Sequence, residues 1–187
     1  DHRECASGAC DVDSGMCVDA GNIAYVDDDA SGGNTACTST SKCKTITAGL
    51  ATDRAFVVVD ADSYMEDLSI ADQDVVIIAY GADLRAQTNG FDALVVAGTT
   101  TDVTIFGLTL RMSQRGLVCQ AGTETAPIGV TLIDVRVEDN ASIGVYAKDC
   151  DLTMNRCHVE SNAGGGQQCN RRRVEDRVAL AVGHRDR

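Results

Sequence analysis

The chain has 187 residues, of which 44% are hydrophobic and only 4% aromatic, with no Trp and a single Pro. Its formal net charge of −12 disfavours nucleic acid and anionic membrane surfaces as partners, because long-range repulsion opposes both. No segment is long and apolar enough for a membrane span, so we expect no membrane insertion. We also expect the protein to be a monomer. A core without large rings has to be filled by Val, Ile, Leu and Ala, which favours thin, regular layers.

Cysteines gather in polar, turn-rich sequence near the start of the chain. Cys5, Cys10 and Cys17 lie among Gly, Ser and Asp, and Cys37 and Cys43 bracket a Thr/Ser loop. Such clusters predict disulfides of an exported protein, so we expect residues 1–20 to form a small, partial disulfide-bonded module. Zinc is the alternative, but no C-x2-C pair or His at ligand spacing accompanies these cysteines. The total of nine is odd, so at least one thiol is unpaired or joined to something outside this chain.

The composition of the sequence changes after this segment. We expect a short strand around Tyr25, followed by an acidic, Gly-rich loop and a helical turn at 45–51. Short β-branched runs separated by Gly, Asn, Asp and Thr then predict an all-β fold. No segment has the length and 3.6-residue period of a crossover helix, which argues against βαβ units. The runs occupy 56–59, 75–78, 93–96, 103–110, 130–137 and 152–159.

Two stretches near the end of this region nearly repeat each other. "GVTLIDVRVEDN" at 129–140 matches "DLTMNRCHVESN" at 151–162 at a shift of 22 residues, and the same template occurs at 103–110. Each unit holds two short strands separated by a two-residue kink. Stacking such units buries one apolar column and pairs each strand with those above and below. We therefore predict a parallel β-helix of ~22-residue coils over residues 21–166.

Several stretches resemble a known family. "YVDDDASGGN", "KCKTITAGL", "VVVDADSYMEDLSI" and "DVVIIAYGADL" are similar to the opening of right-handed parallel β-helix proteins of the pectin lyase-like superfamily. The sequence is similar in particular to secreted bacterial members, some of which carry a short Cys-rich module before the domain. The resemblance implies a right-handed β-helix in an extracellular or bacterial cell-surface protein. It does not specify an activity, because the superfamily holds lyases, hydrolases, epimerases and adhesins.

The 22-residue shift places surface residues in ladders. Thr104, Thr131 and Thr153 should form one outward column and Thr109, Arg136 and His158 another, with Asp134 beside Arg156 and Glu138 beside Glu160. The candidate substrate-binding residues are Arg136, Glu138, His158 and Glu160. Like charges side by side destabilise a sheet, so either Arg136 compensates the two glutamates or they bind Ca²⁺. Ca²⁺ is the one cofactor that the sequence suggests.

No complete catalytic motif is present, so the catalytic residues are unknown. The lone Gly-His lies at 183–184 and is followed by Arg, and no R-x-K occurs. A Ser elbow, a P-loop and an H-E-x-x-H helix are absent as well. Cys157 replaces Leu108 and Val135 at an inward position, which indicates a buried small hydrophobe rather than a nucleophile.

The repeat breaks at Gly166. Gln167 stands where the register requires an apolar inward residue, and an unpaired amide in a dry coil costs about 1–3 kcal/mol. Residues 167–187 also hold six Arg against three acids. We therefore expect the coil to end there, followed by an irregular basic tail over 167–187. The tail either covers the end of the stack or is not native to the fold.

These observations predict an exported or cell-surface β-helix domain that binds extracellular polysaccharide and is non-catalytic in this segment. One alternative is a polysaccharide lyase or glycoside hydrolase, pectate lyase-like in kind, whose catalytic coils are missing here. The other alternative is a structural adhesin stalk.

Overall fold

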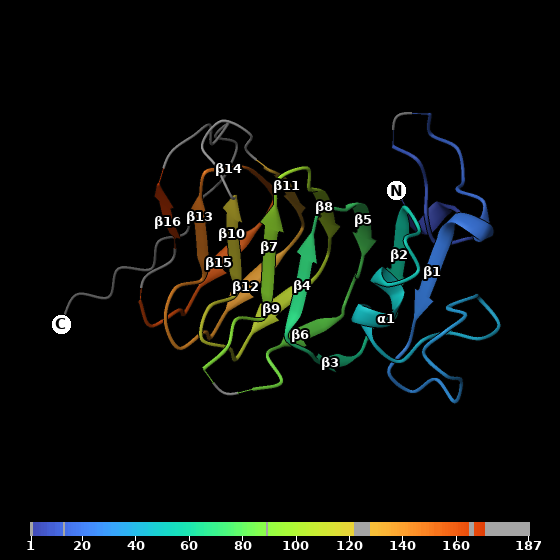
Figure 1. Cartoon of the computed structure of the whole chain (residues 1–187), viewed down its shortest axis with the longest axis horizontal. Helices are drawn as coiled ribbons and strands as arrows, with labels where there is room; N and C mark the ends of the chain where they lie inside the picture. Colours follow the sequence, from blue (N-terminus) through green and yellow to red (C-terminus); the bar gives the residue numbers. More distant parts are fainter. Residues whose placement is uncertain (1, 13, 89, 122–127, 165–166, 171–187) are drawn as a thin grey trace.

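The computed structural model describes residues 2–12, 14–88, 90–121, 128–164 and 167–170, and within them the chain winds into a parallel β-solenoid. Three parallel sheets run along the long axis, with strands of successive coils side by side (Figure 1). The first sheet contains β1 (Ile23–Val26), β2 (Phe56–Val59), β5 (Asp74–Ile78), β8 (Asp102–Phe106), β11 (Ile128–Ile133) and β14 (Cys150–Asn155). The second contains β3 (Ser63–Met65), β6 (Asp83–Arg85), β9 (Thr109–Arg111), β12 (Arg136–Glu138) and β15 (His158–Glu160). The third contains β4 (Leu68–Ala71), β7 (Leu94–Gly98), β10 (Leu117–Ala121), β13 (Val145–Lys148) and β16 (Gln167–Asn170).

The coils differ in length more than the sequence repeat predicted. Phe56 pairs with Val76, a step of 20 residues, whereas Asp74 pairs with Asp102, a step of 28. The predicted 22-residue step holds between β11 and β14, where Thr131 pairs with Thr153. Corners absorb the extra residues, because strand pairing constrains only the strands and leaves loop length nearly free.

The corners turn sharply because single residues adopt left-handed backbone angles. Gly107, Asp134 and Arg156 have φ of 72°, 56° and 54° after successive strands of the first sheet. Met112 and Asp139 do the same after the second sheet, at 53° and 55°. Gly and Asp tolerate this conformation, whereas Arg and Met enter it only when the surroundings impose it. The two-residue kink predicted within each repeat is the first of these corners.

Small aliphatic side chains fill the interior, as the composition predicted. Inward residues such as Leu94, Ile105 and Leu110 have no exposed surface, and Cys157 is 5% exposed among them. Cys157 is thus confirmed as a buried small side chain, and burial raises the pKa of its thiol. Tyr64 is the one aromatic residue in this main cluster of the described residues, and its hydroxyl donates to the Asp60 carbonyl.

A ladder of polar side chains lies inside the corner between the second and third sheets. Asn140 is 2% exposed, and its amide nitrogen donates to the carbonyls of Leu110 and Glu138. The same nitrogen donates to Oδ1 of Asn162, and Oδ1 of Asn140 accepts the Ser113 N–H. The alignment of Asn140 with Asn162 in the 22-residue match is therefore confirmed, and Ser113 lies at the equivalent position of the preceding corner. The ladder satisfies main-chain groups that the corner would otherwise bury without partners.

The helical turn predicted at 45–51 is α1 (Ile46–Leu50), which lies near β1 and β2 at one end of the stack (Figure 1). Thr45 caps it by accepting the Ala48 N–H. The buried carboxylate of Glu66 accepts the N–H groups of Ile46 and Thr47 at 2.6 and 2.9 Å. Glu66 therefore joins the helix to the coil beneath it.

The expectation that the coil ends at Gly166 is wrong for the next four residues. Gln167–Asn170 forms β16, which pairs with β13 in the same 22-residue register, Val145 opposite Gln167. Parallel pairing uses main-chain N–H and C=O groups, which glutamine supplies as well as valine does. Residues 171–187 of the predicted basic tail lie outside the described residues.

The cysteine-rich segment packs against the outer face of the first sheet. Ala9 is completely buried there, and the Tyr25 hydroxyl donates to the Ser7 carbonyl at 3.0 Å. The His2 ring lies edge-on to Phe106, with 4.3 Å between centroids. The segment thus covers apolar side chains that a sheet face would otherwise expose. Among the described residues, no helix has the length and apolar character to cross a membrane.

The structure shows how some of the candidate disulfide cysteines pair. Cys37 and Cys43 form a disulfide, and Cys5 lies beside both Cys10 and Cys17. A sulfur forms one disulfide, so these two partners are alternatives. A further disulfide joins Cys119 of β10 to Cys150 of β14, which the sequence reasoning did not anticipate.

Candidate functional site: a groove along one corner

The four residues predicted to bind substrate lie on adjacent strands of the second sheet. Arg136 pairs with His158 and Glu138 with Glu160, so the predicted ladder is confirmed. The Thr104, Thr131 and Thr153 column and the contact between Asp134 and Arg156 are confirmed as well. Their roles in binding stay predictions.

The surroundings of Glu138 differ from what was expected. Its other neighbour in the sheet is Arg111, and Arg111 also forms an ion pair with Asp83. A cation in the adjacent coil therefore stands next to the pair of glutamates. Among the described residues, the one cluster of three or more possible metal ligands consists of Cys5, Cys10 and Cys17. The calcium prediction thus rests on Glu138 and Glu160 alone.

The structure brings together a second set of residues, which the 22-residue repeat did not place side by side. Three successive corners leading into the third sheet line an open cavity of about 460 Å³. We call it the corner groove. Its lining residues are Gly90, Phe91, Asp92, Gln114, Arg115, Ser142 and Ile143.

Main-chain hydrogen bonds hold these corners in register. The Gln114 N–H donates to the Phe91 carbonyl at 2.8 Å, and the Ala93 N–H donates to the Arg115 carbonyl at 3.0 Å. One coil further, the Gly116 N–H donates to the Ile143 carbonyl at 3.3 Å. Equivalent positions are therefore stacked along the solenoid axis, about 5 Å apart.

A glycine allows this close stacking. A Cβ atom on Gly116 would lie 2.3 Å from Cγ1 of Val137 and 2.7 Å from the Gly144 carbonyl oxygen. Any side chain at Gly116 would therefore push the corner outward and move Arg115 with it.

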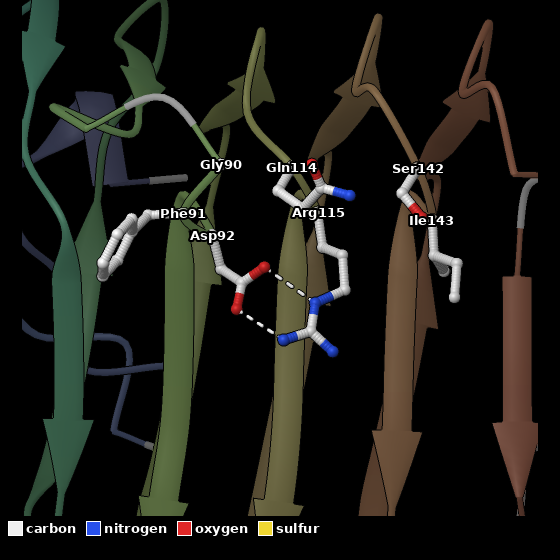
Figure 2. Close-up of a pocket in the computed structure, with 7 residues that line it drawn as sticks. All are labelled: Gly90, Phe91, Asp92, Gln114, Arg115, Ser142 and Ile143. Atoms are coloured by element: carbon white, nitrogen blue, oxygen red, sulfur yellow. Dashed lines mark hydrogen bonds and ion pairs between the residues drawn. The ribbon is translucent and has the colours of Figure 1, made fainter.

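An ion pair crosses the middle of the groove. Nε and Nη2 of Arg115 each lie 2.7 Å from a different carboxylate oxygen of Asp92 (Figure 2). This two-point contact raises the pKa of Arg115 above its usual range. The guanidinium also lies over the Tyr146 ring, 5.6 Å from its centroid. Arg115 is therefore fixed both by a carboxylate and by an aromatic face.

An exposed aromatic ring marks one end of the groove. Phe91 keeps 56% of its surface exposed, in a chain with only three Phe. Figure 2 shows its ring extending away from the ion pair, whereas Ser142 and Ile143 lie on the opposite side of Arg115. The preceding Gly90 has φ of 90°, a turn that suits glycine. The groove thus offers an apolar platform, a fixed ion pair, an amide and a hydroxyl in one row.

This lining suits binding better than catalysis. Hydrolysis of a glycosidic bond usually needs two carboxyl groups, one on each side of the bond. Asp92 is the one carboxylate among the groove's lining residues, and Arg115 occupies both of its oxygens. Arg115 stays protonated at all working pH values and cannot act as a base.

Two other cavities are less suited to a ligand. One, of about 330 Å³, lies beside Lys42, which forms ion pairs with Asp27 and Asp60. The other, of about 290 Å³, lies beside Asp74, whose Oδ1 already accepts the Asp102 N–H. The first has no aromatic residue in its lining, and the second has Phe56, which is half-buried rather than exposed as Phe91 is.

The sequence contained a usable signal for the groove. Asp92, Arg115 and Ile143 each lie two residues before the first paired residue of a third-sheet strand, namely Leu94, Leu117 and Val145. An alignment of the third-sheet strands, rather than of the clearest repeat, would have placed Asp92 beside Arg115. Comparison with protein-family models, with curated proteins and with solved structures finds no match to this chain.

Proposed function

We propose that this chain is an exported or cell-surface β-solenoid domain that binds extracellular polysaccharide and is non-catalytic in this segment. The corner groove is the observation that carries the proposal. Exposed aromatic rings pack against the apolar faces of sugar rings, and planar polar groups fix the sugar hydroxyls. Phe91 supplies the first, while Gln114 and Arg115 supply the second.

Export is supported by the cysteines. Disulfides persist in oxidising compartments and are rare in the cytosol. Cys37–Cys43 and Cys119–Cys150 join positions that lie 6 and 31 residues apart in the sequence. The finer assignment to the pectin lyase-like superfamily belongs to the same proposal. Its support is the sequence resemblance together with the parallel solenoid.

A binding screen with matched variants tests the proposal. We expect the chain to bind a subset of polysaccharides on a glycan array, and Phe91→Ala to weaken binding at least tenfold through loss of a stacking surface. Met112→Ala is the control, because Met112 is 60% exposed and lies outside the groove lining. Equal binding by the wild type and Phe91→Ala would exclude the groove.

The second-sheet ladder is tested in the same screen. Arg136→Ala combined with His158→Ala removes two side chains of the predicted site without touching the groove. Loss of binding in this variant, and not in Phe91→Ala, would move the site to the second sheet. No binding by the wild type to any glycan would favour the adhesin stalk. Growth of ultraviolet absorbance with uronate polymers and calcium would instead indicate a lyase.

A further inference from the structure

The charge of the corner groove is internally neutralised. Arg115 is the one cation among its lining residues, and Asp92 engages it through two hydrogen bonds. The Asp92 side chain is 14% exposed and the Arg115 side chain is 34% exposed, so the pair is partly shielded from water. An anionic ligand would have to displace a carboxylate that is already held at two points.

The charge of the rest of the molecule also opposes the binding of anionic ligands. The whole chain carries a net charge of −12. A polyanion therefore approaches against long-range repulsion and finds no unpaired cation among the residues that line the groove.

Hydrogen-bonding capacity for uncharged groups remains. A guanidinium has five N–H donors, of which Asp92 takes two, so three are left for hydroxyl oxygens. The Gln114 amide both donates and accepts, and so does the Ser142 hydroxyl. These are the partners that a neutral sugar requires, beside the apolar surfaces of Phe91 and Ile143.

The direction of the groove suits a chain rather than a single sugar. Its lining residues form a row that crosses the strands β7, β10 and β13 at their starts (Figure 2). The corner of Phe91 and the corner of Ser142 are two coils apart, which corresponds to about 10 Å along the axis. A ligand that touches both corners has to extend along the solenoid axis.

We infer that the corner groove selects an uncharged, extended glycan chain that lies along the solenoid axis, and that it discriminates against polyuronates. This inference rests on the proposed polysaccharide-binding function. Specificity here comes mainly from Asp92, which cancels the one charge that would attract an acidic sugar.

The experiment compares neutral chains with acidic chains, including one pair that differs only in the oxidation of C6. Isothermal titration at low salt measures the binding of neutral β-1,4-linked gluco-, xylo- and manno-hexasaccharides. It is repeated with the gluco-hexasaccharide oxidised to carboxylate at C6, and with galacturonate and alginate hexamers. We expect the best neutral chain to bind at least tenfold more tightly than any acidic one. Asp92→Asn keeps the shape of the side chain but frees the charge of Arg115, so it should narrow or reverse this preference.

The outcomes separate the two proposals. Acidic chains that bind the wild type as tightly as neutral chains, and lose affinity in Phe91→Ala, would overturn the inference and leave polysaccharide binding intact. An unchanged preference in Asp92→Asn would also overturn it, because charge would not be the cause. No binding by any hexasaccharide would overturn the proposed function and the inference together. Circular dichroism of Asp92→Asn establishes that the variant is folded.

Discussion

The buried amide of Asn140 links three successive corners, so its removal tests how the coils are held beside the groove. Asn140→Ala deletes the acceptor of the Ser113 N–H and the donor to the carbonyls of Leu110 and Glu138. A buried main-chain group that loses its partner costs about 1–3 kcal/mol. A carbonyl oxygen has a second lone pair that can still accept a hydrogen bond. We therefore assign the full cost to the Ser113 N–H and only part of it to each carbonyl. The expected loss is about 2–4 kcal/mol.

The measurement is thermal unfolding of the oxidised protein followed by circular dichroism. For a chain of this size, 1 kcal/mol corresponds to about 2–4 °C, so Asn140→Ala should lower the melting temperature by about 5–15 °C. Asn155→Ala is the matched control, because Asn155 is exposed at the end of β14 and should change stability by less than about 0.5 kcal/mol. Similar melting temperatures for the two variants would refute the idea that the Asn140 hydrogen bonds stabilise the corners.

Three further predictions concern other parts of the molecule. Gly107→Ala should cost about 2–4 kcal/mol, because its Cβ would lie 2.3 Å from Tyr80 at φ of 72°, whereas Gly15→Ala, at φ of 69° with nothing within 4 Å, should cost about 1 kcal/mol. Chemical denaturation compares them, and equal losses would contradict the steric argument. Burial lowers the pKa of His2, so the folded state resists a proton that the unfolded chain accepts. Stability should therefore fall as pH drops below about 6.5, and less so in His2→Phe; parallel melting curves against pH would contradict this. Millimolar calcium should raise the melting temperature of the wild type and not that of the Glu138→Ala/Glu160→Ala double variant, and an equal rise in both would exclude that site.

The sequence predicted the fold where neighbouring coils resemble each other. The 22-residue match placed Asp134 beside Arg156 and Glu138 beside Glu160, because a parallel ladder turns a constant shift into contact. The groove escaped this reasoning, since Phe91, Gln114 and Ser142 stack without resembling one another.

The repeat also hid the Cys119–Cys150 disulfide, because β10 and β14 belong to different sheets and a repeat shift relates only strands of the same sheet. The end of the repeat at Gln167 was misjudged for a different reason. The prediction weighed side-chain burial, whereas continuation depends on main-chain pairing. A sequence repeat therefore indicates register reliably and indicates the limits of a solenoid less well.

The Cys119–Cys150 bond has a mechanical consequence. Each coil is held mainly by its neighbours, so a pull on the C-terminal side peels strands from the stack in order, beginning with β16. At the disulfide the load passes from Cys150 directly to Cys119, so the strands between these residues (β11, β12 and β13) do not extend while the bond is intact. The oxidised chain therefore extends by less under load than the reduced one, whereas the corners of Asp92 and Arg115 precede Cys119 and lie outside the protected segment.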